Sequence, residues 1–164
     1  MNAKNYIVHD DPAIMSTNQY IAMVDLAAFG FVNQMEQVWL GAEGDGSYEV
    51  LCIPFRVYGL SLHDIVELDL DEDIVSEVVR RGGHRTMRAL IGPGVSADGI
   101  AEISTAINSF TEVSGFLSEW SGNRHVAIDI PAGGDPRDLQ EFFVRQREAE
   151  RIYWEWSDVK PFVR

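Results

Sequence analysis

The sequence has little of several things, and each shortage excludes a class of protein. Among 164 residues there is a single cysteine, Cys52, so no disulfide can form within the chain, as is usual in a reducing cytosol. No apolar run approaches the roughly 20 residues that a membrane-spanning helix needs. The first 11 residues lack the apolar core of a signal peptide. We therefore expect a cytoplasmic protein that is not bound to a membrane.

Basic residues are also scarce, and they are unevenly placed. The chain has 13 Lys and Arg against 26 Asp and Glu, a net charge of −13. Residues 1–75 carry 13 of the acids and two bases, Lys4 and Arg56, whereas residues 76–164 carry the other 11 bases. Proteins that bind nucleic acids need a basic surface, so this class of partner is disfavoured. The acidic first half is explained either by solubility or by a cationic partner.

Well-known catalytic and cofactor motifs are missing. The sequence has no phosphate-binding P-loop, no GxGxxG, no GxSxG and no HExxH. Cys52 has no CxxC partner and is expected to be a packed, buried residue. The acidic stretch 64–73 lacks the central glycine and terminal glutamate of a calcium-binding EF-hand. We predict no cofactor and no metal, and we favour a protein that is not an enzyme.

What the chain does contain is typical of one globular domain, with 46% apolar and 24% charged residues. Polar residues 1–18 predict a partly ordered arm, and residues 19–164 predict a single α+β domain. Within residues 19–80, short apolar runs alternate with turns. They predict a short-stranded antiparallel sheet or partial barrel, with strands at 20–27, 35–40, 48–53, 65–70 and 74–80.

Residues 81–160 have a different pattern, in which predicted helices alternate with strands. Ser96 is a suitable N-cap for a helix whose apolar face is Ile100, Ile103, Ile107 and Phe110, and Asp135-Pro136 begins a second helix. Strands are expected at 86–91, 113–120, 124–130 and 152–156. The order β-α-β-β-α-β predicts a ferredoxin-like half, with an antiparallel sheet and two helices on one face. In strand 124–130, one face is Val126, Ile128 and Ile130, and the other is His125, Ala127 and Asp129.

Several short segments resemble, in order and spacing, the bacterial domain-of-unknown-function family 4265. The segments are Gln37–Leu40, Gly44–Val50, Ile53–Phe55, Tyr58–Val66, Gly82–Thr86 followed by Arg88, Val126–Pro131, and Tyr153–Trp156. The resemblance covers about residues 35–157. The chain departs from the family pattern at His63, where glycine is usual, and at Gly82, where serine is usual. The resemblance implies a fold and a bacterial origin, and no activity comes with it.

The richest polar segment is Arg80–Arg88. One interpretation is a loop whose arginines and backbone donors hold an anion such as phosphate or carboxylate, with His84, Arg85 and Arg88 as ligand-binding residues. The alternative is a simple connection between strands, in which glycines adopt positive φ and Arg80 or Arg81 pairs with Asp64 or Glu67.

Other polar pairs carry weaker signals. His63 and Asp64 are adjacent and point to opposite faces of a strand, so contact between them is not expected. His125 and Asp129 share a strand face but have no third ligand at metal-binding spacing. The same face lacks the stacking aromatics of an RNA-binding sheet. The aromatic end of the chain is either core or an interaction surface, and it comprises Tyr153, Trp154, Trp156 and Phe162.

Two functions from different classes follow. The first is a non-enzymatic protein-binding module, such as a bacterial immunity protein that neutralises a cationic toxin domain. Its contact residues are the acids Asp45, Asp69, Asp71, Glu72 and Asp73. The alternative is a domain that binds an anionic small molecule, or an uncharacterised enzyme, with a site near His84 and Arg88 at the junction of the two halves. The oligomeric state is left open.

Overall fold

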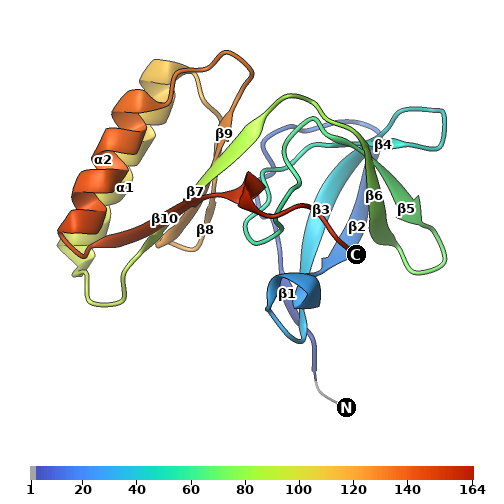
Figure 1. Ribbon diagram of the computed structural model, residues 1–164, viewed down its shortest axis with the longest axis horizontal. Coiled ribbons are helices and arrows are strands. Elements are labelled where there is room, and N and C mark those ends of the chain that lie inside the picture. Colours follow the sequence, from blue (N-terminus) through green and yellow to red (C-terminus); the bar gives the residue numbers. More distant parts are fainter. Residues whose placement is uncertain (1–2) are drawn as a thin grey trace.

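The computed structural model describes residues 3–164 and shows a β-rich unit beside a unit with two helices (Figure 1). In the second unit a sheet lies between the helices and the β-rich unit. The strands are β1 (Asn5–Ile7), β2 (Gln19–Asp25), β3 (Gln34–Ala42), β4 (Tyr48–Val50), β5 (Ile65–Asp69), β6 (Ile74–Arg80), β7 (Arg85–Ile91), β8 (Ser118–Ser121), β9 (His125–Ile130) and β10 (Ile152–Trp156). The α-helices are α1 (Ala97–Ser114) and α2 (Arg137–Glu148).

The β-rich unit is a closed five-stranded barrel, with β1 added outside it. The strand order is β1-β3-β2-β6-β5-β4, and an additional pairing of β3 with β4 closes the ring. This corrects the prediction of an antiparallel sheet or partial barrel, because β2 meets β6 in parallel and the ring has no gap. The cause is the length of β3, in which Leu40 and Gly41 pair with β2 on one side and with β4 on the other.

The barrel core follows the two-residue period of its strands. Its fully buried side chains include Ala22, Val38, Leu40, Val66 and Val75. The segment expected to be a partly ordered arm is bound to this barrel, since β1 pairs in parallel with β3 and His9 is buried. The N-terminal residues from Asn5 to His9 therefore contribute to the packed structure.

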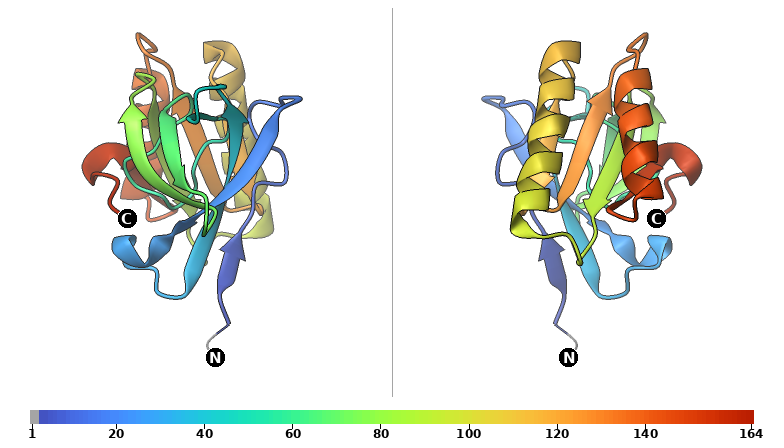
Figure 2. Two further views of the ribbon diagram at one scale, coloured as in Figure 1. Left: turned by 90° about the vertical axis from the view of Figure 1, so that its right-hand side faces the viewer. Right: turned by 90° about the vertical axis from the view of Figure 1, so that its left-hand side faces the viewer.

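The second unit has the predicted order of elements. Its sheet has the strand order β10-β7-β9-β8, all pairs are antiparallel, and both helices cover one face (Figure 2). Ser96 caps α1 as predicted, by accepting a hydrogen bond from the Gly99 amide at 3.2 Å. The strand expected from Val113 was placed too early. The helix continues to Ser114, where Gly115 ends it at φ 71°.

The two faces of the second sheet have different neighbours. The face under the helices carries Met87, Ala89, Val126 and Ile128, which pack with Phe143 and other apolar residues of the helices. The opposite face turns towards the barrel, where Ala127 packs with Ile53, Phe55 and Leu62. The predicted alternation in 124–130 is confirmed. It places polar side chains of β7 and β9 at the junction of the two units.

Neither α-helix in residues 3–164 combines the length and the apolar character that a membrane span requires.

Candidate ligand-binding site

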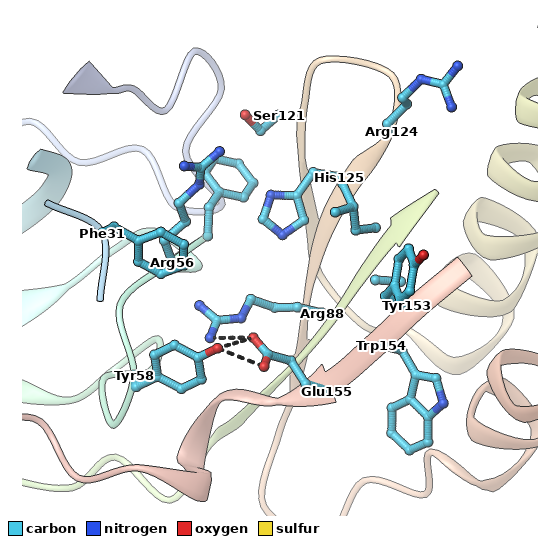
Figure 3. A pocket seen from close by; sticks show the side chains of 13 residues that line it. Phe31, Arg56, Tyr58, Arg88, Ser121, Arg124, His125, Tyr153, Trp154 and Glu155 are labelled. Atoms are coloured by element: carbon cyan, nitrogen blue, oxygen red, sulfur yellow. Dashed lines mark hydrogen bonds and ion pairs between the residues drawn. The ribbon is translucent and has the colours of Figure 1, made fainter. Parts of the chain in front are cut away.

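A cavity of about 500 Å³ lies at the junction of the two units (Figure 3). The barrel side contributes Phe31 and the segment that follows β4, and the other side is formed by β7, β9 and β10, mainly by the face that turns towards the barrel. Its volume is in the range of small-molecule sites. The lining residues are Phe31, Phe55, Arg56, Tyr58, Arg88, Ala89, Leu90, Ser121, Arg124, His125, Tyr153, Trp154 and Glu155.

Arg88 is the most deeply buried charged group of this lining, with 2% of its surface exposed. Its Nη1 donates a hydrogen bond to the Val57 carbonyl at 3.0 Å, and its guanidinium lies over the Tyr58 ring, 4.5 Å from the centroid. Nη2 is 2.9 Å from Oε1 of Glu155. Within the described residues, however, neither Nε nor Nη2 has a hydrogen bond of acceptable geometry. A buried donor without an acceptor is costly, so this guanidinium is incompletely satisfied.

Glu155 is the only carboxylate among the residues that line this cavity, and it is partly open to solvent. Its side chain is 40% exposed. The Tyr58 hydroxyl donates to both carboxylate oxygens, at 2.9 and 2.7 Å. Burial, together with Glu155, raises the pKa of Tyr58, so the phenol keeps its proton at neutral pH. Tyr58 thus holds Glu155 beside Arg88.

Positive charge dominates the rest of the cavity. Arg56 lies over the Phe31 ring at 5.5 Å and donates to Gln34. Arg124 is fixed at the opposite end, where it donates to backbone carbonyls of the loop after β7. The Arg124 guanidinium is bound to that loop and points away from Arg88 in Figure 3, so the guanidinium groups of Arg88 and Arg56 are the positive charges of the lining, beside one carboxylate, in a protein whose net charge is −13. This distribution favours an anionic occupant.

His125 supplies the neutral polar group of the lining. Burial lowers its pKa to about 4, with a further contribution from the positive charges of Arg88 and Arg56. No hydrogen bond joins its imidazole to another residue in the part of the chain that the structure describes. At neutral pH this ring therefore offers one donor and one acceptor to a molecule in the cavity.

The barrel wall of the cavity is held by a buried charge cluster around His9. The His9 ring bonds Glu36 at 3.1 Å and Glu119 at 2.7 Å, and it stacks on Phe55 at 4.4 Å. Burial lowers the pKa of His9, but Cys52 and the hydrogen bonds to Glu119 and Glu36 outweigh it and raise the pKa to about 12. The imidazole is therefore charged.

The two carboxylates of this cluster also bind backbone. Glu36 accepts hydrogen bonds from the amides of Phe55, Arg56 and Val57, and Glu119 accepts one from Ile53. Burial raises the pKa of Glu36, but His9 and these amides outweigh it and keep the pKa low. The ionised pair thus fixes the segment 53–57 that carries Arg56 to the cavity.

The three predicted ligand residues do not lie together. Arg88 is in the junction cavity, as expected for a site between the halves. His84 and Arg85 line a separate cavity of about 360 Å³ that shares no lining residue with the first. The reason is the alternation of side chains in β7, because Arg85 and Arg88 are three positions apart and point to opposite faces.

Three basic side chains around the smaller cavity, His84, Arg85 and Arg81, already have carboxylate partners. His84 bonds Asp129 at 2.8 Å, and Arg85 donates to Asp158 at 2.8 and 3.2 Å while lying over the Trp156 ring. Arg81 is 3.0 Å from Asp64, so the expected pair with an acid of the first half is confirmed.

The two residues that depart from the family pattern, His63 and Gly82, lie against each other. His63 adopts φ 67°, a conformation that glycine tolerates best, and its ring lies 4.7 Å from that of His84. A Cβ on Gly82 would lie 2.5 Å from the His63 carbonyl oxygen. His63 bonds Glu49 and not Asp64, in keeping with the expectation that the adjacent pair does not touch.

Three further expectations concern metal binding, Cys52 and the aromatic end. In residues 3–164, no group of three or more His, Cys, Asp or Glu side chains is arranged to hold a metal. Cys52 is buried in the barrel core, as predicted. Trp154 and Trp156 pack against the second core, and Tyr153, 66% exposed, stands at the cavity. Phe162 packs on the barrel.

The acids expected to contact a cationic partner lie at two turns of the barrel. Asp69, Asp71, Glu72 and Asp73 gather at the β5–β6 turn, and Asp45 is in the β3–β4 turn. Some are already engaged within the chain. Arg164 binds Asp69 at 3.1 Å and Glu72 at 2.5 Å, and Tyr20 donates to Asp73. Asp71 and the engaged acids still form an exposed, negative turn.

Sequence reasoning missed most of the cavity. Arg56, Tyr58, Arg124 and His125 come from distant segments, and Glu155 appeared only within an aromatic strand. The signal that was available is the scarcity of bases in the first half, where Arg56 is one of two.

A model of the Domain of unknown function (DUF4265) matches residues 36–154. The chain belongs to the DUF4265 family. Most of the cavity lining falls within this DUF4265 match, and Phe31 and Glu155 fall outside it. A crystal structure of a hypothetical protein from Neisseria gonorrhoeae is similar, with a TM-score of 0.65 and 16% identity over 88% of this chain and 98% of that one. At this identity the likeness shows the fold alone. No curated protein matches the chain.

Proposed function

We propose that this protein binds a small anionic molecule in the cavity between its two units. The observation that carries the proposal is Arg88, whose buried guanidinium lies beside a cavity of about 500 Å³. Among the described residues, its Nε has no hydrogen-bond partner, and its Nη2 has only the ion pair with Glu155 at 2.9 Å. Arg56 adds positive charge to the same cavity. An anion gains from both guanidinium groups, and a partly enclosed site reduces screening by salt.

Binding without a chemical step fits the lining best. A nucleophile activated by a base needs the two groups within hydrogen-bond reach. His125 is the neutral imidazole of the cavity, and no hydroxyl or thiol of the described residues is hydrogen-bonded to it. Tyr58 directs its hydroxyl hydrogen to Glu155. The polar groups are thus arranged to hold a ligand.

A thermal-shift experiment with phosphate, citrate, acetate and benzoate tests the proposal. A ligand at 100 times its Kd stabilises the folded state by about 2.7 kcal/mol, which corresponds to a rise of roughly 5–10 °C in Tm for a chain of this size. We expect at least one anion to raise Tm in the wild type and to have no effect on Arg88→Gln. The matched control is Arg85→Gln, which removes an arginine outside the cavity. The proposal is wrong if no anion raises Tm, or if Arg88→Gln responds like the wild type.

We also propose that the second unit is ferredoxin-like. The support is its chain order β7-α1-β8-β9-α2-β10, its antiparallel strand order β10-β7-β9-β8 and the position of both helices on one face. The barrel then occupies the face of this sheet that the helices leave open, and the ligand lies between them.

The binding of a cationic protein, such as a toxin domain, is a second proposal. It rests on the exposed β5–β6 turn, where four acids meet one basic residue, Arg164. A pull-down from the native host at low and high salt tests it. Because charges at the rim of an interface act mainly on the association rate and its salt dependence, the partner is expected to be lost at high salt. The control is a variant in which Asp71 and Glu72 are replaced by Asn and Gln. If this variant captures the partner as well as the wild type does, the electrostatic argument for this proposal is wrong.

A further inference from the structure

Taking the proposed anion-binding function as given, we propose that the ligand is a carboxylic acid with an apolar body, and that its carboxylate replaces the carboxylate of Glu155 on Arg88. The Glu155 carboxylate lies where the acid group of the proposed ligand would bind. The inference starts from which nitrogens of Arg88 are left without a hydrogen bond.

The two unsatisfied nitrogens form one edge of the guanidinium. Arg85 shows how this edge binds a carboxylate in the same molecule, because its Nε and Nη2 donate to the two oxygens of Asp158 at 2.8 and 3.2 Å. In Arg88 the same pair, Nε and Nη2, makes no hydrogen bond of acceptable geometry with residues 3–164. Glu155 has an oxygen 2.9 Å from Nη2, yet it does not form the two parallel bonds. The edge is therefore occupied by a carboxylate that fits it poorly.

The two partners differ in how firmly they are held. Arg88 is buried, bonds the Val57 carbonyl at 3.0 Å and lies over the Tyr58 ring. Glu155 is 40% exposed and is bound by the Tyr58 hydroxyl (Figure 3). When a competing anion arrives, the guanidinium stays in place and the Glu155 side chain turns towards solvent. Tyr58 then donates its hydrogen bond to the incoming group.

The geometry favours a carboxylate over a phosphate. Two coplanar oxygens match the Nε and Nη2 edge, and the space released by Glu155 is that of one carboxylate. The rest of the lining is largely aromatic or aliphatic and includes Phe31, Phe55, Leu90 and Tyr153. Such walls stabilise an apolar body by burial and by ring stacking.

Calorimetric titration with four probes tests the inference, namely benzoate, 2-naphthoate, benzamide and inorganic phosphate. In the wild type, we expect 2-naphthoate to bind more tightly than benzoate, and neutral benzamide to bind more weakly than either. Glu155→Gln removes the competing charge and is expected to bind both carboxylates about five- to tenfold more tightly. Arg88→Gln loses the binding. Glu102→Gln, which removes an acid that pairs with Arg151 outside the cavity, leaves the affinities unchanged.

A second measurement distinguishes the displacement of the Glu155 carboxylate from a general increase in positive electrostatic potential in the cavity. The Arg88 Nε–H signal in a proton–nitrogen NMR spectrum is identified by its absence in Arg88→Gln. On addition of benzoate to the wild type, this signal is expected to shift downfield as Nε gains its acceptor. If Glu155→Gln favours phosphate as much as benzoate and the Nε–H signal does not move, displacement is overturned.

The remaining outcomes distinguish this inference from the function on which it rests. If phosphate binds in an Arg88-dependent way and neither benzoate nor 2-naphthoate binds, the ligand is not a carboxylic acid. The proposed anion-binding function is then still supported. Equal affinity for benzoate and benzamide would also contradict the inference that the ligand binds through a carboxylate. If none of the four probes binds the wild type or Glu155→Gln, both proposals fail.

Discussion

The segment from Tyr58 to Ser61 contributes to the lining of two cavities, and arginines line both. Around the smaller one, Arg81, Arg85 and His84 each have a carboxylate partner in Asp64, Asp158 and Asp129. Around the larger one, Arg88 is more deeply buried and lies 2.9 Å from Glu155, yet its hydrogen bonds to the described residues are incomplete. The comparison teaches that the number of cations does not mark a binding site. The cations whose hydrogen bonds the protein leaves unmade are the informative ones.

The largest expected effect comes from removing the charge that holds one wall of the larger cavity. His9→Ala leaves Glu36 and Glu119 buried without their counter-ion, and such a loss costs about 3–5 kcal/mol of unfolding free energy. Urea unfolding measures it. Arg85→Ala, which removes the exposed pair with Asp158 at the smaller cavity, is the control and is expected to cost roughly 1 kcal/mol. Equal losses in the two variants would contradict the contrast between the cavities.

The second effect is a pH dependence that belongs to the larger cavity. The pKa of His125 is about 4 in the folded protein against 6.5 ordinarily, so the unfolded chain binds the extra proton first as the pH falls. Stability is therefore expected to decrease by about 3 kcal/mol between pH 6.5 and pH 4. Urea titrations at several pH values measure this slope, and His125→Gln should remove most of it. An unchanged slope in that variant would assign the dependence to other groups.

The third effect separates stability from binding. Arg88→Met replaces an incompletely bonded buried cation with an apolar side chain of similar length. Because Glu155 is 40% exposed, water can solvate its carboxylate after the change, and we expect a loss of only about 1 kcal/mol. Anion binding in the junction cavity is expected to disappear. Thermal unfolding with and without the anion that the wild type binds measures both. If the Arg88→Met variant is strongly destabilised but still binds the anion, Arg88 stabilises the fold and does not bind the ligand.

The smallest effect is expected at the acidic turn. Arg164→Gln removes the cation that binds Asp69 and Glu72, and a pair this exposed contributes only about 0.2–1 kcal/mol. Unfolding at low and high salt measures it, and the difference from the wild type should shrink as salt is added. A loss comparable with that of His9→Ala would show that the turn is a structural element of the barrel.

Local patterns predicted a large part of the fold. Ser96 as an N-cap, Asp135-Pro136 before the second helix and the alternation around Ala127 are decided by neighbours in sequence, and all three are found. Closure of the barrel depends on β2 meeting β6 at Met23 and Ile74, some 50 residues apart, which no local pattern encodes.

The candidate site was less predictable for the same reason. Arg88 was identified because it lies in a polar segment that also resembles the family. His9 was assigned to an arm, because its partners Glu36 and Glu119 are 27 and 110 residues away. Arg85 was grouped with Arg88 by proximity in sequence, although a strand sends the two side chains to opposite faces.

The His9 cluster also has a consequence for motion. Glu36 belongs to the barrel and Glu119 to β8 of the other unit, and one imidazolium binds both. A hinge movement between the units would separate these charges in a buried environment, where an unpaired ion is strongly unfavourable. The cluster therefore opposes hinge motion between the two units and any change in the width of the cavity between them. The proposed ligand would then enter by side-chain rotation at the rim of the cavity.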